Sequence, residues 1–162
     1  DYRYRSENRK VFVREHLAEI LIEEKIKMYV IIVGGGQVGH SLARLLMGEK
    51  HEVLLVEKDP ARYSKLSEEF GESVILGDGA ELDTLMDMGV NRADVLVAVT
   101  GMDQDNLVIC QMAKILYLIP RTIARVNDPK NEEIFQSLGV DATVSSTRII
   151  GSLIAVPPPP SQ

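Results

Sequence analysis

The feature that most restricts the fold is the glycine-rich turn Gly34-Gly-Gly-Gln-Val-Gly39, which directly follows the apolar run Tyr29–Val33. In dinucleotide-binding proteins the first glycine of this spacing permits a tight turn, the second leaves room for a pyrophosphate, and the third lets the next helix approach the sheet. The N–H groups and positive dipole end at the start of that helix favour an anion. We therefore predict a nucleotide site over Gly34, Gly36 and Gly39; a merely tight strand–helix turn is the alternative.

Patterns of strand and helix alternate along the rest of the central chain. Short apolar runs of strand length are separated by longer segments whose apolar residues recur at helical spacing. This alternation predicts an α/β fold, namely a Rossmann-like doubly wound parallel sheet of about six strands with helices on both faces. The expected strands are residues 29–33, 52–56, 73–76, 94–99, 122–126 and 142–144, and the expected helices are residues 36–47, 60–70, 81–88, 103–118, 129–138 and 147–155.

A carboxylate ends the second predicted strand. Glu57 follows the apolar run Val53–Val56 and lies eighteen residues after Gly39. A carboxylate there can accept hydrogen bonds from both hydroxyls of an adenosine ribose and would repel a 2′-phosphate, so it favours NAD over NADP. Lys58 beside it could weaken this preference. The alternative for Glu57 is a solvated charge at a strand end, outside the core.

The ends of the third and fourth predicted strands carry further candidates, because ligands of open α/β sheets lie outside the carboxyl ends of the strands. Strand three runs into Gly77-Asp-Gly79, where Asp78 could bond the adenine side of a ligand or cap the next helix. Strand four runs into Thr100 and Gly101, which should face the same crevice as the glycine-rich turn, and Asp103 follows at a helix start.

Arg125 lies near the end of the fifth predicted strand, among apolar residues. An unpaired charge in such surroundings would be costly. We therefore expect its guanidinium to contact either a carboxylate of the chain or a phosphate of the ligand.

The two ends of the chain differ from its centre. Residues 1–27 are dense in charge, and their apolar residues recur at helical spacing from about residue 11 to residue 26, so we predict an arm and helix that form a linker or an extension. Residues 28–155 form the predicted nucleotide-binding domain. Residues 156–162 contain four consecutive prolines and are predicted to be a disordered tail.

Composition excludes some classes of protein. A net charge of −6 argues against a general nucleic-acid binder, since no broad basic surface would collect phosphates. No apolar run approaches the ~18 residues that a membrane span needs. The single cysteine, Cys110, cannot form an internal disulfide and is expected to be a buried thiol in a reducing, cytoplasmic compartment.

Taken together, the motifs resemble those of a known family. They are Val33-Gly-Gly-Gly-Gln-Val-Gly39, Val56-Glu-Lys-Asp-Pro60, Gly77-Asp-Gly79, Val97-Ala-Val-Thr100 and Ile123-Ala-Arg-Val-Asn-Asp128. In this combination, over roughly residues 28–155, the chain is similar to the nucleotide-binding half of the KTN/RCK family. The resemblance is strongest to the TrkA-like regulatory subunits of Trk-type potassium uptake systems.

The resemblance implies an NAD(H)-binding regulator that forms a homodimer or larger ring beneath a membrane potassium transporter or channel. Carried over by position, the dinucleotide contacts would be Gly34, Gly35, Gly36, Gln37, Val38, Glu57, Thr100, Gly101 and Arg125; the residue patterns above add Gly39 and Asp78. Gln37 stands where ATP-binding relatives often have an arginine, which favours NAD(H) but leaves ATP or ADP open.

An NAD-dependent oxidoreductase fragment is the alternative function, because the same glycine pattern serves both classes. Hydride transfer usually needs an acid–base group beside the nicotinamide. The three histidines, at positions 16, 40 and 51, do not offer one convincingly. We therefore predict that the protein is not an enzyme and assign no catalytic or metal-ligating residue.

The last predicted helix carries an apolar stripe of Ile149, Ile150, Leu153 and Ile154. Such a stripe normally seeks a partner surface. Either it forms a dimer contact or it docks on its own sheet.

Overall fold

The computed structural model describes residues 27–87 and 89–155. Its centre is one six-stranded sheet in the order β3-β2-β1-β4-β5-β6, and every neighbouring pair is parallel. The strands are β1 (Tyr29–Val33), β2 (Glu52–Glu57), β3 (Val74–Leu76), β4 (Val95–Ala98), β5 (Arg121–Arg125) and β6 (Ala142–Val144). The strand order reverses between β1 and β4, so their carboxyl ends frame the crevice in which doubly wound sheets bind ligands. The predicted fold class is confirmed.

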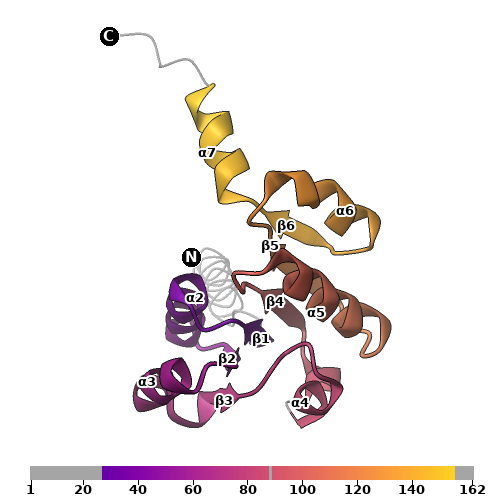
Figure 1. The fold of residues 1–162 in the computed structure, drawn as a ribbon. Coiled ribbons are helices and arrows are strands. Elements are labelled where there is room, and N and C mark those ends of the chain that lie inside the picture. The colour runs from indigo at the N-terminus through magenta and orange to yellow at the C-terminus, as the bar shows by residue number, and fades with distance from the viewer. Residues whose placement is uncertain (1–26, 88, 156–162) are drawn as a thin grey trace, which may run out of the picture.

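Helices cover both faces of the sheet (Figure 1). On one face lie α2 (Gln37–Gly48) and α3 (Pro60–Phe70), and on the other lie α4 (Leu82–Asp87), α5 (Asp103–Ile115) and α6 (Glu132–Ser137). Short 3₁₀ helices η1 (Gly71–Ser73), η2 (Val90–Arg92) and η3 (Pro129–Asn131) complete the connections, and α7 (Ser146–Ile154) follows β6.

The core forms two apolar layers, one on each face. Successive side chains of β1 point to opposite faces: Ile31 packs in the layer with Ile109 of α5, and Ile32 packs in the layer with Leu66 of α3. All five residues of β1 are buried, as expected of a central parallel strand that reads as an unbroken apolar run. The layers fix β1 and therefore the start of the glycine-rich turn.

Two predicted helices differ from the observed ones. The helix expected over 103–118 ends at Ile115, because the chain turns back into β5 through Leu118, whose φ of 53° is left-handed. The helix expected over 129–138 is divided into η3 and α6, and Asp128 caps η3 by accepting a hydrogen bond from the Lys130 N–H. Most other boundaries differ from the prediction by one residue, which is ordinary for helix and strand ends.

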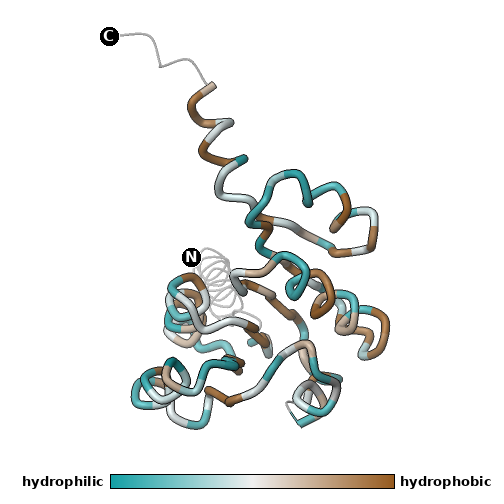
Figure 2. Tube along the Cα trace, viewed as in Figure 1, coloured by the Kyte–Doolittle hydropathy of each residue, from teal (hydrophilic) through white to brown (hydrophobic). Residues whose placement is uncertain are grey.

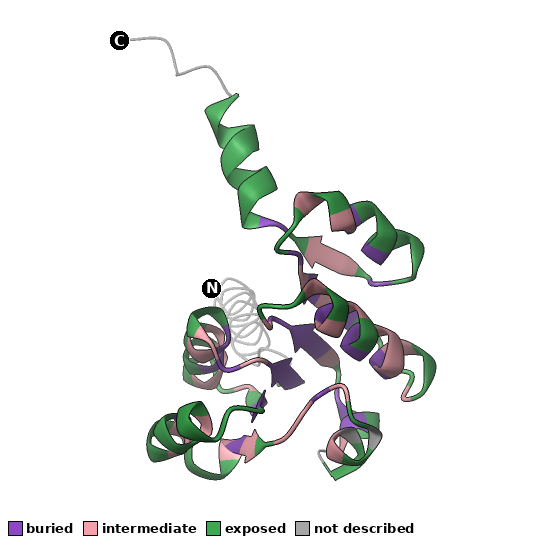
Figure 3. Ribbon diagram, viewed as in Figure 1, coloured by how far each residue is buried: buried purple, intermediate pink, exposed green. Residues whose placement is uncertain are grey.

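Helix α7 leaves the sheet beyond β6 and projects from the domain (Figures 1 and 3). All of its residues are exposed, its apolar stripe included. Figure 2 shows the hydrophobic positions along this helix. Of the two alternatives for the stripe, docking on its own sheet is therefore wrong. The predicted helix over 11–26 and the predicted tail over 156–162 lie outside the described residues.

Cys110 lies on the buried face of α5, as predicted. Burial raises the pKa of its thiol to about 12, so it stays protonated and unreactive at neutral pH. Among the described residues, no helix combines the length and the apolar character that crossing a membrane would require.

Candidate nucleotide-binding site

The glycine-rich turn joins β1 to α2 in the manner that its spacing predicts. Gly34 has a φ of 111°, and a Cβ there would lie 2.9 Å from the Thr100 backbone nitrogen, so the ends of β1 and β4 are in close contact. At Gly39 a Cβ would lie 1.8 Å from the Gly34 carbonyl oxygen, so only glycine lets α2 start this close to the strand.

Gly36 is different, because a Cβ built there meets no atom within 4 Å. Gly36 is also the N-cap residue of α2, and no side chain makes a capping hydrogen bond at this helix start. Gln37 and Val38 form the exposed beginning of the helix. The turn thus presents backbone N–H groups and the positive end of a helix dipole to open space, which suits an anionic ligand.

Glu57 is buried and not a solvated strand end. The residue is 3% exposed. Its Oε2 accepts a hydrogen bond from the Gly35 N–H at 2.8 Å, and its Oε1 accepts one from the Asp59 N–H at 2.9 Å. The carboxylate therefore ties the glycine-rich turn to the end of β2, and the expectation that it lies outside the core is wrong.

The acceptor capacity of Glu57 is also mostly used. Besides the two backbone N–H groups, Arg62 Nη1 donates to Oε2 at 3.2 Å and forms an ion pair with it. A carboxylate offers about four lone-pair sites. With three donors in place, Glu57 can accept about one more hydrogen bond, and bonding both hydroxyls of a ribose would require one of the present donors to leave.

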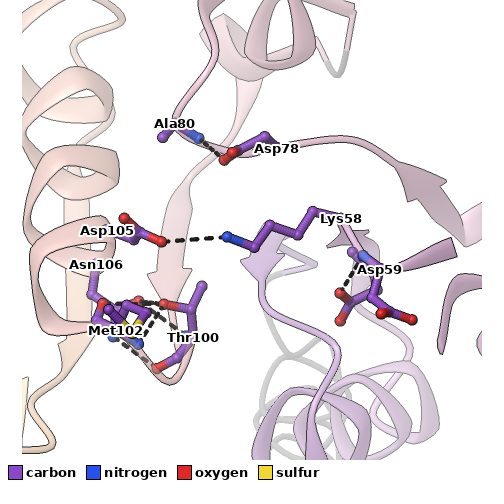
Figure 4. Close-up of polar contacts among 9 residues, drawn as sticks. Lys58, Asp59, Asp78, Ala80, Thr100, Met102, Asp105 and Asn106 are labelled. Atoms are coloured by element: carbon purple, nitrogen blue, oxygen red, sulfur yellow. Dashed lines mark hydrogen bonds and ion pairs between the residues drawn. The ribbon is translucent and has the colours of Figure 1, made fainter. Parts of the chain in front are cut away.

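An ion pair spans the crevice above the turn (Figure 4). Lys58, at the end of β2, extends to Asp105 on α5, with 3.5 Å between Nζ and Oδ2. Nearby, the Asp78 Oδ1 accepts a hydrogen bond from the Ala80 N–H at 2.9 Å. This bond orders the turn after β3. Because Ala80 precedes α4, which begins at Leu82, the bond is not the helix cap considered for Asp78.

Thr100 is held by Asn106, a residue that the sequence analysis did not single out. Asn106 is 0% exposed. Its Oδ1 accepts hydrogen bonds from the Thr100 N–H and hydroxyl at 3.0 and 2.6 Å, and its Nδ2 donates to the Thr100 carbonyl oxygen at 3.1 Å (Figure 4). The Nδ2 also donates to the Arg125 carbonyl oxygen at 2.9 Å. One amide thus joins the ends of β4 and β5 to α5. A polar residue within the buried stripe Asn106, Ile109, Cys110 and Ala113 was the available sequence signal.

Asp103, at the start of α5, likewise joins two parts of the chain through hydrogen bonds. Its Oδ1 accepts hydrogen bonds from the Asn127 N–H and Nδ2, and its Oδ2 accepts them from the Asp128 N–H and Asn131 Nδ2, all between 2.7 and 2.9 Å. Burial raises the pKa of Asp103, but these hydrogen bonds outweigh it and leave the pKa below its usual value. The start of α5 is thereby fastened to the connection between β5 and α6.

Arg125 is half-buried at the end of β5. Its guanidinium makes no ion pair or hydrogen bond with any of the described residues, so the carboxylate partner considered for it is not found in that part of the chain. On the face of the sheet that α5 and α6 cover, a hollow of about 610 Å³ is lined by Gly101, Asp103, Asn127 and Phe135 among others. Within residues 27–87 and 89–155, no group of three or more His, Cys, Asp and Glu side chains is placed to hold a metal ion.

The structure brings the predicted residues together only in part. The turn of residues 34–39 lies against Glu57 on one side and against Thr100 on the other. Gly101 is exposed just beyond Thr100. Whether these residues, Asp78 and Arg125 contact a ligand stays a prediction.

The sequence matches the TrkA-N domain family over residues 30–146. A curated relative, the "Trk system potassium uptake protein TrkA homolog" of Methanothermobacter thermautotrophicus, is 41% identical over 121 residues, which cover 75% of this chain and 56% of the relative. The chain therefore spans little more than half the length of that protein.

Solved structures with the same fold include a domain of an inner membrane protein and two structures of a channel. The TrkA-N domain of the inner membrane protein ybaL from Escherichia coli has a TM-score of 0.72 at 20% identity and covers 81% of this chain and 96% of that one. The GsuK channel bound to NAD has a TM-score of 0.68 at 22% identity and covers 80% of this chain and 23% of that one. A GsuK structure bound to ADP has a TM-score of 0.67 at 22% identity and covers 79% and 33%.

Proposed function

The chain belongs to the TrkA-N domain family, and on this basis we propose that it is the nucleotide-binding regulatory part of a potassium transporter or channel. It binds NAD(H) in the crevice between β1 and β4 and transmits occupancy as a change of conformation. The observation that carries the proposal is the turn at Gly36, open and uncapped at the point where the strand order reverses. The relative named as a potassium uptake protein and the NAD-bound channel structure support the same role. ADP or ATP is the second choice of ligand.

The protein binds nucleotide without consuming it. Both histidines in the described part of the chain are engaged elsewhere: His40 Nε2 is 2.6 Å from Glu69 Oε2, and His51 Nδ1 accepts a hydrogen bond from the Met28 N–H at the amino end of β1. A general acid or base must reach the proton that it transfers. The arrangement of these histidines supports a sensor over an oxidoreductase.

Ligand contact with the second half of the sheet would come from Thr100, Gly101 and Arg125. Thr100 and Gly101 follow β4 directly beside the turn, since β1 and β4 abut there. Because the guanidinium of Arg125 makes no ion pair with any residue that the structure describes, its donors can serve an anionic group. These residues would contact the phosphate or the second ribose of the ligand.

A polar route leads from the crevice to α7. Asp103 fastens the start of α5 to Asn131 at the end of η3. The next residue, Glu132, is buried at the start of α6 and pairs with Arg148 of α7 at 2.7 Å. A ligand that displaces the start of α5 would therefore move α6 and reorient α7, provided that it binds the two arrangements with different affinity.

Helix α7 is the proposed contact between copies of the chain. Its exposed stripe of Ile149, Ile150, Leu153 and Ile154 would be covered in a homodimer or a larger ring. The regulator would act at the cytoplasmic side of the membrane, beneath its transporter or channel, with residues 28–155 as the sensing domain and residues 1–27 as a linker or extension.

A ligand panel tests the proposal. NAD, NADH, ATP and ADP are titrated against the chain in a thermal-shift assay, in which a ligand of the folded state raises stability by RT ln(1 + [L]/Kd). The largest shift is expected for NADH or NAD. The same preparation should show no multiple turnover of NADH with lactate, aldehyde or quinone substrates. Turnover near ~1 s⁻¹, within the enzyme range, would contradict the sensor role.

A further inference from the structure

We propose that Arg62, at the start of α3, makes the adenosine end of the crevice a site for a ribose 2′-phosphate, so that NADP(H) binds there alongside NAD(H). The inference rests on the proposed function, because it assumes that a dinucleotide lies over the glycine-rich turn. It concerns the one position, the ribose 2′ carbon, at which the two dinucleotides differ.

The first step is the loss of the repulsion that normally excludes a 2′-phosphate. An exposed carboxylate at the end of β2 would repel the phosphate dianion. Glu57 is instead 3% exposed, and its charge is directed at the Gly35 and Asp59 N–H groups and at Arg62. A carboxylate that is buried behind the glycine-rich turn and paired with a guanidinium presents little negative potential to the crevice.

The second step is the position of Arg62. Asp59 caps α3 and its Oδ1 accepts the Arg62 N–H at 2.7 Å, so Arg62 is fixed in the first turn of the helix. Among the described residues, Glu57 alone engages its guanidinium, through one N–H group at 3.2 Å, and the Arg62 side chain is 53% exposed. The remaining donors form the planar fork that binds phosphate oxygens in pairs.

The third step is the charge around this position. Lys58 supplies a second cation at the same strand end, and its present partner is Asp105 across the crevice. Asp59 opposes it, but its carboxylate is used as the cap of α3. Glu57, Lys58, Asp59 and Arg62 sum to no net charge, so the adenosine end lacks the negative surplus that selects against NADP(H).

Calorimetric titration of the whole chain with NADH and with NADPH tests the inference. The parent should bind NADPH no more than about tenfold more weakly than NADH. Arg62→Ala should lower the ratio of NADPH to NADH affinity by roughly tenfold or more, the scale of hydrogen bonds to a charged group, and Arg62→Lys should restore part of it. Lys65→Ala, which removes the same charge from an exposed position of α3, should leave the ratio within about twofold.

The outcomes separate the two proposals. If neither dinucleotide binds, the proposed function fails and this inference fails with it. If NADH binds but NADPH is more than about tenfold weaker, or if Arg62→Ala leaves the ratio unchanged, the sensor role stands and Arg62 is not a phosphate ligand. A urea titration of each variant confirms that the domain is folded.

Discussion

The two halves of the sheet meet at one crevice but are fastened there by different chemistry. On the β1–β2 side a buried carboxylate, Glu57, holds the glycine-rich turn. On the β4–β5 side a buried neutral amide, Asn106, holds both strand ends, while Arg125 has no side-chain partner among the described residues. The group that holds the strand ends of the first half is therefore charged, and the one that holds those of the second half is neutral.

The halves also differ in where their contacts lead. In the first half the Glu57 carboxylate bonds to Gly35, Asp59 and Arg62 around the glycine-rich turn, and Lys58 pairs with Asp105 of α5. The second half continues outward through Asp103, η3 and the Glu132–Arg148 pair to the exposed helix α7. We infer that the first half binds the ligand and that the second half transmits its presence to α7 as a change of conformation.

The largest effect is expected at α7. The pair Ile150→Asp and Ile154→Asp places two charges in the proposed contact, and each buried apolar side chain is worth ~1.5–3 kcal/mol, so association should weaken by at least about a hundredfold. Light scattering with sedimentation measures the shift to monomer. Ser152→Asp, on another side of the same helix, should have little effect. A parent that is monomeric at micromolar concentration would remove α7 as the contact.

The next largest effect is expected at the anchor of the second half. Asn106→Ala leaves the Thr100 N–H and two carbonyl oxygens without their buried partner, which should cost about 3 kcal/mol in the free energy of unfolding. Urea titration gives the value. The exposed neighbour variant Gln104→Ala should stay within about 0.5 kcal/mol of the parent. Equal values for the two variants would show that Asn106 does not hold the strand ends.

The anchor of the first half should matter somewhat less for stability and more for binding. Glu57→Gln keeps the volume but weakens the bonds to the Gly35 N–H and Arg62, for an expected loss of about 1–2 kcal/mol. NADH affinity should fall as well, because the turn loses its support. A variant that is as stable as the parent and binds equally well would show that the carboxylate neither holds the turn nor touches the ribose.

The smallest expected effect is on how the free energy of unfolding depends on pH at Asp103. The pKa of Asp103 is lowered in the folded chain, so its contribution to stability is complete above the unfolded value near 3.8 and is lost as the pH falls through the lower folded value. Between about pH 6 and about pH 3, Asp103→Asn should therefore lose less stability than the parent in urea titrations. If the parent and Asp103→Asn lose the same free energy of unfolding as the pH falls, the four hydrogen bonds do not stabilise the charged form of Asp103.

Local pattern was sufficient to predict the fold, and it supplied the residues of the candidate site. Strand and helix periods, the glycine spacing and the strand ends predict the sheet, its crevice and the residues around it, because each depends on a few neighbouring residues. The packing glycines Gly34 and Gly39 behave as their spacing indicates.

What pattern could not predict is how polar groups are shared across the sheet. The burial of Glu57 depends on the Gly35 N–H, twenty-two residues away, and on a turn of α3. Asn106 has a partner carbonyl at Arg125, on another strand. The early end of α5 follows from the route that the chain takes into β5, and α7 is joined to α6 by the Glu132–Arg148 pair, so neither is visible in a helical period.

The central claim is that an anion of the ligand lies over Gly36, and Gly36→Val tests it most directly. Because a Cβ at Gly36 meets no atom within 4 Å, the variant should fold with nearly the stability of the parent, while its branched side chain occupies the place of the pyrophosphate. Calorimetry should find NADH binding to the parent and none to the folded variant. NADH binding of equal affinity in both would show that the ligand does not lie over this turn.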